Sequence, residues 1–152
     1  MSNKEINILV ASMTGNALMS AEEIAEYCKS QNVKTKLEEI EHTDISVLKN
    51  KGIFLICSST YGQGDIPDAA HKFFNELKEA SPDLSHINYL LFGLGDMTYK
   101  ETFAQGGKKF DSLFCSLNAK RITKPFYHDA SDGTLPEEAA VEWFKSEVIN
   151  LI

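Results

Sequence analysis

Short, nearly continuous apolar runs alternate with helical patterns along the chain, and this alternation limits the possible folds more than any other feature. The runs EINILVA (5–11), GIFLICS (52–58) and YLLFGLG (89–95) are almost uninterrupted, and residues 33–40 and 120–127 are also strand-like. Strands that are covered by helices on both faces carry apolar side chains on both sides. We therefore predict five strands in a parallel, buried sheet.

Apolar residues recur at helical spacing between these runs. The four stripes are Leu18, Ala21, Ile24, Ala25 and Cys28; Ala70, Phe73, Phe74 and Leu77; Phe110, Leu113, Phe114 and Leu117; and Ala140, Phe144, Val148 and Leu151. Parallel strands joined by helices imply right-handed crossovers. We predict an α/β fold with a doubly wound five-stranded parallel sheet in the order 2-1-3-4-5 and helices on both faces.

Length and composition favour one domain over residues 1–152, because 152 residues with 43% hydrophobic content can bury one sizeable core. No apolar run approaches the ~20 residues of a membrane span. Residues 1–5 lack the features of a signal peptide, so we expect a cytoplasmic protein. Cys28, Cys57 and Cys115 are far apart and form no C-x-x-C pair. They are therefore predicted to be reduced thiols, and we predict no metal site.

The charge of the chain argues against a nucleic acid partner. The net charge is −7, which repels a polyanion, and no basic stripe with interleaved aromatic residues offsets that repulsion.

In a doubly wound sheet, ligands bind beyond the carboxyl ends of the strands where the winding direction reverses, so the loops after strands one, three and four are of most interest. The first loop, SMTGNA (12–17), precedes a helix that begins near Asn16 or Ala17. Backbone N–H groups at a helix N-terminus, together with side-chain donors on Ser12, Thr14 and Asn16, suit a phosphate. A simple helix cap has a similar composition, so the other loops must decide.

The second loop, SSTYGQGDIPDAA (58–70), places a tyrosine beside two glycines. Gly62 and Gly64 permit positive φ and a close backbone approach. Tyr61 offers a flat amphipathic surface that can stack on a planar ligand. The alternative is a tyrosine that closes over the edge of the core.

The third loop, GLGDMTYKETF (93–103), leaves the sheet at Gly93 and Gly95 and carries Tyr99. This G-x-G lacks a third glycine and follows the fourth strand, so it is not a dinucleotide fingerprint. Two tyrosines on neighbouring loops, next to a phosphate cradle, could hold a planar ring between two phenols. Flavin mononucleotide (FMN) has that anatomy.

The chain resembles the short-chain flavodoxins over essentially its whole length, and especially the FMN modules of diflavin reductases and sulfite reductase flavoproteins. The segments that carry the resemblance are SMTGNA (12–17), STYGQGD (59–65), GLGDMTY (93–99) and GKKFD (107–111).

The resemblance implies a role for each segment. The FMN phosphate would be bound by Ser12, Met13, Thr14, Gly15, Asn16 and Ala17. Tyr61 and Tyr99 would flank the isoalloxazine, and the Tyr61–Gly62 backbone would meet the central-ring nitrogen that gains a proton on one-electron reduction. Asp96 would lie near the pyrimidine end of the ring, although a loop aspartate can also simply cap its own backbone. The remaining cofactor-binding residues implied are Ser59, Thr60, Gln63, Gly64, Gly95 and Phe103.

The sequence departs from the family pattern in two places. Many relatives have Ser or Thr where this chain has Ala17, so one hydroxyl donor is missing and we expect somewhat weaker phosphate binding. The spacing from Tyr99 to Phe103 is one residue longer than usual, which leaves the placement of Tyr99 open. No long insertion splits the fifth strand, and this disfavours the long-chain subgroup.

The resemblance implies an electron carrier and not an enzyme. FMN suits such a carrier, since it takes up two electrons in single steps. Residues 61–103 hold seven acidic residues and three lysines. Such a charge opposes the second electron and attracts a basic partner, unless these acids are only a solvated surface. We expect a monomer whose partners are a basic-surfaced flavodoxin reductase and an unidentified acceptor protein.

Other functions have less support in the sequence. A response-regulator receiver needs clustered acids after the first strand, and residues 11–14 have none. A hydrolase needs a nucleophile such as Ser or Cys beside a histidine base. None of the four histidines lies in such a constellation: His42, His71, His86 and His128. Two alternatives stay open: an FMN-dependent NAD(P)H quinone reductase, for which we find no segment left to bind nicotinamide, and a redox-silent FMN-binding regulatory module.

Overall fold

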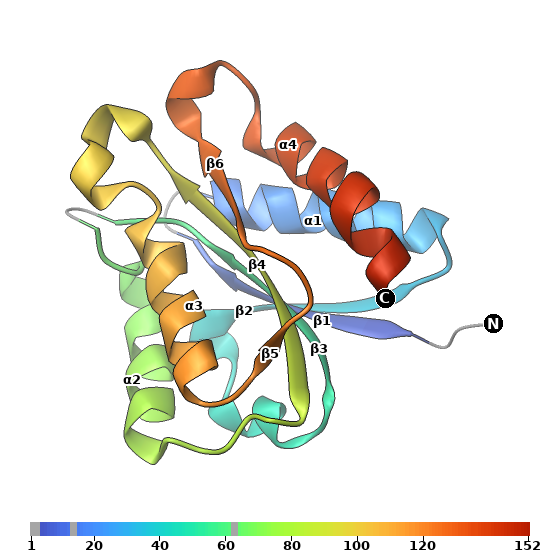
Figure 1. Ribbon diagram of the computed structural model, residues 1–152, viewed down its shortest axis with the longest axis vertical. Helices are drawn as coiled ribbons and strands as arrows, with labels where there is room; N and C mark the ends of the chain where they lie inside the picture. Colours follow the sequence, from blue (N-terminus) through green and yellow to red (C-terminus); the bar gives the residue numbers. More distant parts are fainter. Residues whose placement is uncertain (1–3, 13–14, 62–63) are drawn as a thin grey trace.

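The computed structural model describes residues 4–12, 15–61 and 64–152, and its centre is a parallel sheet in the order β2-β1-β3-β4-β5 (Figure 1). The four long strands are β1 (Glu5–Ala11), β2 (Lys34–Glu39), β3 (Gly52–Ser58) and β4 (Ile87–Gly95). Every pairing between neighbouring strands is parallel. The predicted order 2-1-3-4-5 is confirmed.

The fifth position of the sheet differs from the prediction of one continuous strand over 120–127. Two short strands, β5 (Lys120–Arg121) and β6 (Phe126–Asp129), both pair with β4. Tyr89 pairs with Arg121 and Phe92 with Phe126, so two residues of β4 face the four residues 122–125. Pro125 lies in this interval and has no N–H to give to the ladder, which favours the interruption.

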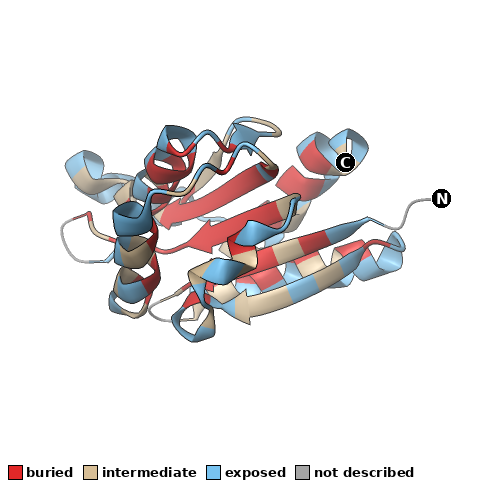
Figure 2. Cartoon of the chain, turned by 90° about the horizontal axis from the view of Figure 1, so that it is seen from below, coloured by how far each residue is buried: buried red, intermediate tan, exposed pale blue. Residues whose placement is uncertain are grey.

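Helices cover both faces of the sheet, as predicted (Figure 1). The α-helices are α1 (Asn16–Ser30), α2 (His71–Ala80), α3 (Gln105–Ser116) and α4 (Pro136–Trp143). Alternate residues of one strand point to opposite faces. Leu9 accordingly joins a buried cluster with residues of α2 and α3, whereas Ile8 joins a second cluster with residues of α1 and α4. Figure 2 shows the central strands buried and the outer faces of the helices exposed, while β2 at the edge of the sheet is only partly buried.

Shorter helical segments complete the described chain. They are the 3-10 turns η1 (Ile40–His42), η2 (Ile45–Lys49), η3 (Asp68–Ala70), η4 (Met97–Thr102), η5 (Ala130–Asp132) and η7 (Ile149–Leu151), and the π-helical turn η6 (Phe144–Val148). The last apolar stripe predicts a helix that runs on to Leu151, and α4 instead widens into η6 at Phe144, although Phe144 and Val148 stay buried. Among the described residues, no helix combines the length and the apolar composition needed to cross a bilayer.

The carboxyl ends of β1, β3 and β4 come together at one edge of the sheet. Ala11 pairs with Ser58, and Ser58 pairs with Gly93. The segments that follow these strands therefore start side by side.

Candidate functional site

A cavity of about 470 Å³ lies at this edge and collects residues from four loops. Its lining comprises Asn16; Ser59, Thr60 and Tyr61; Leu94, Gly95, Asp96, Tyr99 and Thr102; and His128, Ala130, Thr134 and Pro136. The volume lies in the range of roughly 300–1,000 Å³ that small-molecule sites occupy. The three loops that the sequence singled out do meet here.

The first loop leads directly into α1. Gly15 has φ +91°, a left-handed conformation that favours glycine, and its N–H donates to Ser12 Oγ at 3.0 Å. The first turn of α1 carries no acidic residue, so its positive end is not neutralised there. The Ala17 side chain is buried in the apolar cluster beside α1 and α4, which leaves only its backbone for a ligand. Met13 and Thr14 lie outside the described residues.

The second loop is held by its main chain and by one hydroxyl. Tyr61 N donates to Asp65 O at 2.8 Å, and Asp65 N donates to Tyr61 O at 2.9 Å. Thr60 Oγ1 donates to Leu94 O at 2.9 Å and accepts from Gly106 N at 3.1 Å, so it joins this loop to β4 and α3. The Tyr61 side chain remains 43% exposed. Gly62 and Gln63 lie outside the described residues.

The third loop begins with a capped turn. Asp96 lines the cavity and also accepts from Thr98 N at 2.8 Å, which is the local capping role considered as its alternative. Tyr99 has the non-helical angles φ −111° and ψ 70° inside η4 and is 66% exposed. The segment from Tyr99 to Phe103 follows this kink, and within it Thr102 Oγ1 donates to Tyr99 O at 3.2 Å.

Several predicted site residues do not line the cavity. Gly64 packs against α3, since a Cβ on it would lie 3.2 Å from Gln105 Cβ. The Phe103 ring lies 5.5 Å from Lys108 Nζ and packs against Gly95. Ser12, Gly15 and Ala17 are also absent from the lining of this cavity. The cavity itself contains Asn16, Ser59, Thr60, Tyr61, Gly95, Asp96 and Tyr99 from the predicted set.

The comparisons with known proteins agree on one family. The sequence profile described as Flavodoxin matches residues 8–143. The chain is 35% identical over 140 residues to Flavodoxin YqcA of Escherichia coli (strain K12), which covers 91% of this chain and 93% of that one. Among solved structures, a cysteine-to-alanine mutant of flavodoxin from Pseudomonas aeruginosa superposes with a TM-score of 0.84 at 25% identity, covering 97% and 98% of the two chains.

The chain belongs to the flavodoxin family. Flavodoxins are electron carriers that use FMN, so membership gives this chain that cofactor and that general activity. The chain is also 36% identical over 120 residues to the sulfite reductase [NADPH] flavoprotein alpha-component of Buchnera aphidicola, but this match spans only 20% of that larger protein.

The residues of this flavodoxin fit FMN in the chemistry that they offer. Tyr61 and Tyr99 are large side chains that stay exposed on one cavity, and phenols of this kind suit a planar amphipathic ring. Asn16 and Ser59, which carry an amide and a hydroxyl, line the same cavity beside the start of α1. Together they provide neutral donors and a positive helix end for a phosphate.

Sequence reasoning missed the fourth loop of the site, which follows β6. His128 is only 2% exposed, lines the cavity and has Nε2 2.8 Å from Thr134 Oγ1. Asp129 Oδ1 accepts from Met97 N at 2.9 Å and from Ser131 N at 2.9 Å, which ties this loop to the third one. The hydrogen bond from Met97 N–H, followed by those from Ser131, lowers the pKa of Asp129. The turn-forming composition DASDGT (129–134) was the available signal.

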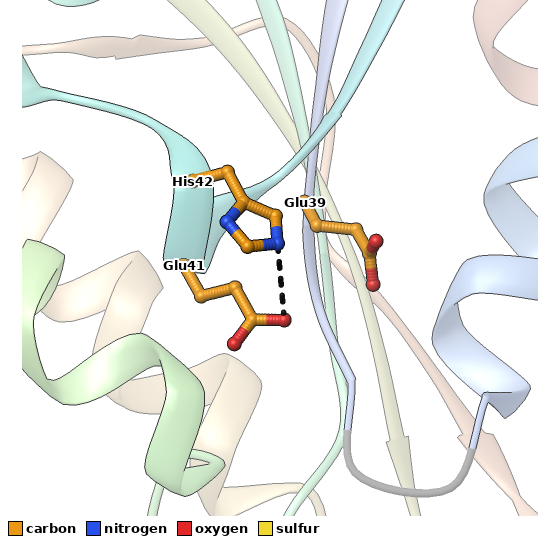
Figure 3. A group of neighbouring side chains, drawn as sticks. All are labelled: Glu39, Glu41 and His42. Carbon is orange, nitrogen blue, oxygen red and sulfur yellow. Dashed lines mark ion pairs between the residues drawn. The ribbon is translucent and has the colours of Figure 1, made fainter.

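Among the residues that the structure describes, one group of side chains that could bind a metal occurs at the end of β2 (Figure 3). Glu39, Glu41 and His42 have ligand atoms within 4.8 Å of one another, and all three residues are exposed. His42 Nε2 lies 3.6 Å from a Glu41 carboxylate oxygen. Exposed contacts of this type contribute little to stability, and we assign the group no role in the flavodoxin site.

Proposed function

We propose that this chain holds FMN in the cavity between its loops and carries single electrons from a basic-surfaced flavodoxin reductase to an acceptor protein. The observation that carries the proposal is the placement of two exposed phenols, Tyr61 and Tyr99, on one donor-lined cavity at the carboxyl edge of the sheet. A tyrosine that merely closed over the core would be buried, and neither of these is.

Each part of the cavity has a distinct task in this proposal. The start of α1 with Asn16, joined by Ser59 and by Ser12 just outside the lining, binds the phosphate through backbone and side-chain donors. Tyr61 and Tyr99 stack on the ring and exclude water from its faces. FMN supplies stepwise one-electron redox chemistry when bound.

Charge around the cavity supports a basic partner. The chain has a net charge of −7, and the hydrogen bond from Met97 N–H helps to keep the pKa of Asp129, beside the cavity, below its ordinary value. Asp129 is therefore a fixed negative charge at neutral pH. Opposite charges steer association, and salt screens them over about 10 Å at 0.1 M ionic strength. Raising ionic strength should slow reduction by a flavodoxin reductase, measured by stopped flow; a rate that is independent of salt would remove this part of the proposal.

We further propose that the chain works as one domain and as a monomer in the cytoplasm. Two apolar clusters lie on opposite faces of one continuous sheet, which supports a single folding unit. All three cysteines are free, including the exposed Cys115, and unpaired thiols are typical of a reducing compartment.

Two measurements test the function. Calorimetric titration of flavin-free protein with FMN should show saturable binding, and absence of binding would refute the proposal. Stepwise reduction of the loaded protein with dithionite under anaerobic conditions should then resolve two one-electron steps. A single two-electron step, or NADPH oxidation by the protein alone in the presence of a quinone, would favour the quinone reductase instead. Bound FMN that no reductase can reduce would favour the regulatory module.

A further inference from the structure

A second cavity, of about 530 Å³, lies between α2 and α3 next to the proposed FMN site, and it is rich in basic side chains. Its lining includes His71, Lys78, Lys108 and Lys109. Three of these four side chains contact other groups of the protein. Lys109 Nζ lies 3.2 Å from Asp65 Oδ1, and His71 Nε2 lies 3.4 Å from Asp65 Oδ2. Lys108 Nζ lies 5.5 Å from the centres of the Phe103 and Tyr127 rings. The basic side chains of this cavity are therefore better explained as groups that hold Asp65 than as a binding site for a free anion.

Asp65 joins these two helices to the loop that carries Tyr61. Its carboxylate contacts Lys109 of α3 and His71 of α2 through different oxygens. Its main chain exchanges two hydrogen bonds with Tyr61, at 2.8 and 2.9 Å. Oδ1 also accepts from Ile66 N at 2.8 Å, which fixes the orientation of the carboxylate.

The start of α3 supports the same loop by direct backbone contact. A Cβ on Gly106 would collide with the main-chain oxygen of Ser59 and lie 3.1 Å from Asp65 O. The backbone of α3 is thus pressed against the loop on both sides of Tyr61. Asp65 and Tyr61 are thus linked directly by two main-chain hydrogen bonds.

We propose that Asp65, Lys109 and His71 form a polar anchor that sets the position of Tyr61 for ring stacking, and that all three are positioning residues. The proposal rests on the proposed function only where FMN is concerned. The anchor itself is a property of the flavin-free protein and can be measured there.

A purely electrostatic role predicts a different pattern of effects. FMN carries a negative phosphate, so if Asp65 and Lys109 acted only through their charges, D65N would tighten FMN binding and K109A would weaken it. If they position Tyr61, both changes remove the same contact. Both variants must then weaken binding, and the double variant should lose little more than either single one.

The first experiment uses flavin-free protein and follows hydrogen exchange of the Tyr61 and Asp65 amides by NMR. D65N and K109A should each speed exchange by about two- to fivefold, the effect expected of a partly exposed ion pair. K72A is the matched control, because Lys72 is an exposed lysine on α2 that pairs with Glu76 at 3.3 Å. K109R keeps the cation and should restore protection. Unchanged protection of both amides in D65N and K109A would overturn the anchor.

The second experiment measures FMN dissociation constants by quenching of flavin fluorescence. D65N, K109A and D65N/K109A should each raise the constant by about two- to fivefold, while K72A and K109R stay near the wild-type value. Tighter binding by D65N would overturn the proposal in favour of simple charge effects. If wild-type protein bound no FMN, the proposed function would fail, while the exchange experiment would still decide whether the anchor exists.

Discussion

At the scale of single residues, the most informative side chains are those that the fold leaves in contact with water although they are large and partly apolar. Tyr99 is 66% exposed and lies on the proposed FMN cavity. Its place in η4 is set by the Asp96 cap and by the Thr102 hydroxyl. An exposed phenol held in one place by its neighbours costs little further ordering when a planar ring stacks on it.

Removing the Tyr99 ring should weaken FMN binding. We expect Y99A to raise the dissociation constant about two- to tenfold, as for the loss of one aromatic stacking contact. Y99F keeps the ring and should bind nearly as well as wild type. Fluorescence titration measures both, and equal affinity of Y99A and wild type would exclude stacking by this residue.

The Thr60 hydroxyl links three segments of the chain: its own loop, β4 and α3. Its hydroxyl donates to Leu94 O and accepts from Gly106 N. T60V keeps the shape of the side chain but removes the hydroxyl, so both partners lose a hydrogen bond. The free energy of unfolding should therefore fall by about 1–2 kcal/mol. T60S retains the hydroxyl and should lose less. Urea unfolding measures the difference, and equal losses in the two variants would show that the methyl group matters more than the hydrogen bonds.

At the scale of elements, the start of α3 determines how closely β3 and β4 meet the helix. Gly106 faces the main chain of Ser59 and Thr60, and a Cβ on Gly107 would lie 3.1 Å from Gly93 Cα. In both cases the nearest atom belongs to the main chain, which cannot move aside as a flexible side chain can. The GG pair of α3 is therefore a packing requirement of the second loop and of β4, and not a weakness of the helix.

Adding one methyl group should test this close approach. G106A should lower the free energy of unfolding by about 1–3 kcal/mol through overpacking, and should weaken FMN binding as well because the second loop must shift. G52A is the control, since a Cβ on Gly52 meets only ordinary contacts at 3.5 Å or more. Thermal and urea unfolding report the difference, and a wild-type midpoint for G106A would contradict the packing argument.

The sequence was sufficient for the strand order and three of the loops because both depend on strong local patterns. Runs such as those around Ile8 and Leu55 can only lie inside, and the loops that follow such strands must meet at one edge. The break before Phe126 was not foreseen, because a single Pro125 in a short run is compatible with an edge strand. His128 was missed because its burial depends on long-range pairing with Leu94, which no local pattern encodes.

At the scale of the whole molecule, aspartates at turns support the fold around its periphery. Hydrogen bonds from nearby backbone or side-chain groups lower the pKa of several of them, led by Ser46 N–H for Asp44, Ser85 N–H for Asp83, Met97 N–H for Asp129 and the Thr134 hydroxyl for Asp132. The ionised form of each carboxylate is therefore more stable in the folded chain than in the unfolded chain.

Acid should consequently destabilise the fold. A depressed folded-state pKa contributes stability that is fully present above the ordinary aspartate value of 3.8 and is lost as pH falls through the lowered folded-state value. The unfolding midpoint should thus hold steady at neutral pH and decline below about pH 4. Calorimetry from neutral pH down to about pH 2.5 measures this, and a D129N variant should show a shallower decline. A midpoint that rose on acidification would contradict the assignment.

The interruption between β5 and β6 gives this molecule a site at which an insertion should be tolerated. Arg121 is aligned by Tyr89 and Phe126 by Phe92, and Ile122 N still donates to Tyr89 O at 3.0 Å. The register of the sheet therefore does not have to pass through residues 123–125. Lys124 in that stretch is exposed. A peptide tag inserted there would extend outward from the edge of the sheet, at the opposite end of β6 from the loop that borders the cavity, and would offer a handle for immobilising the protein on an electrode.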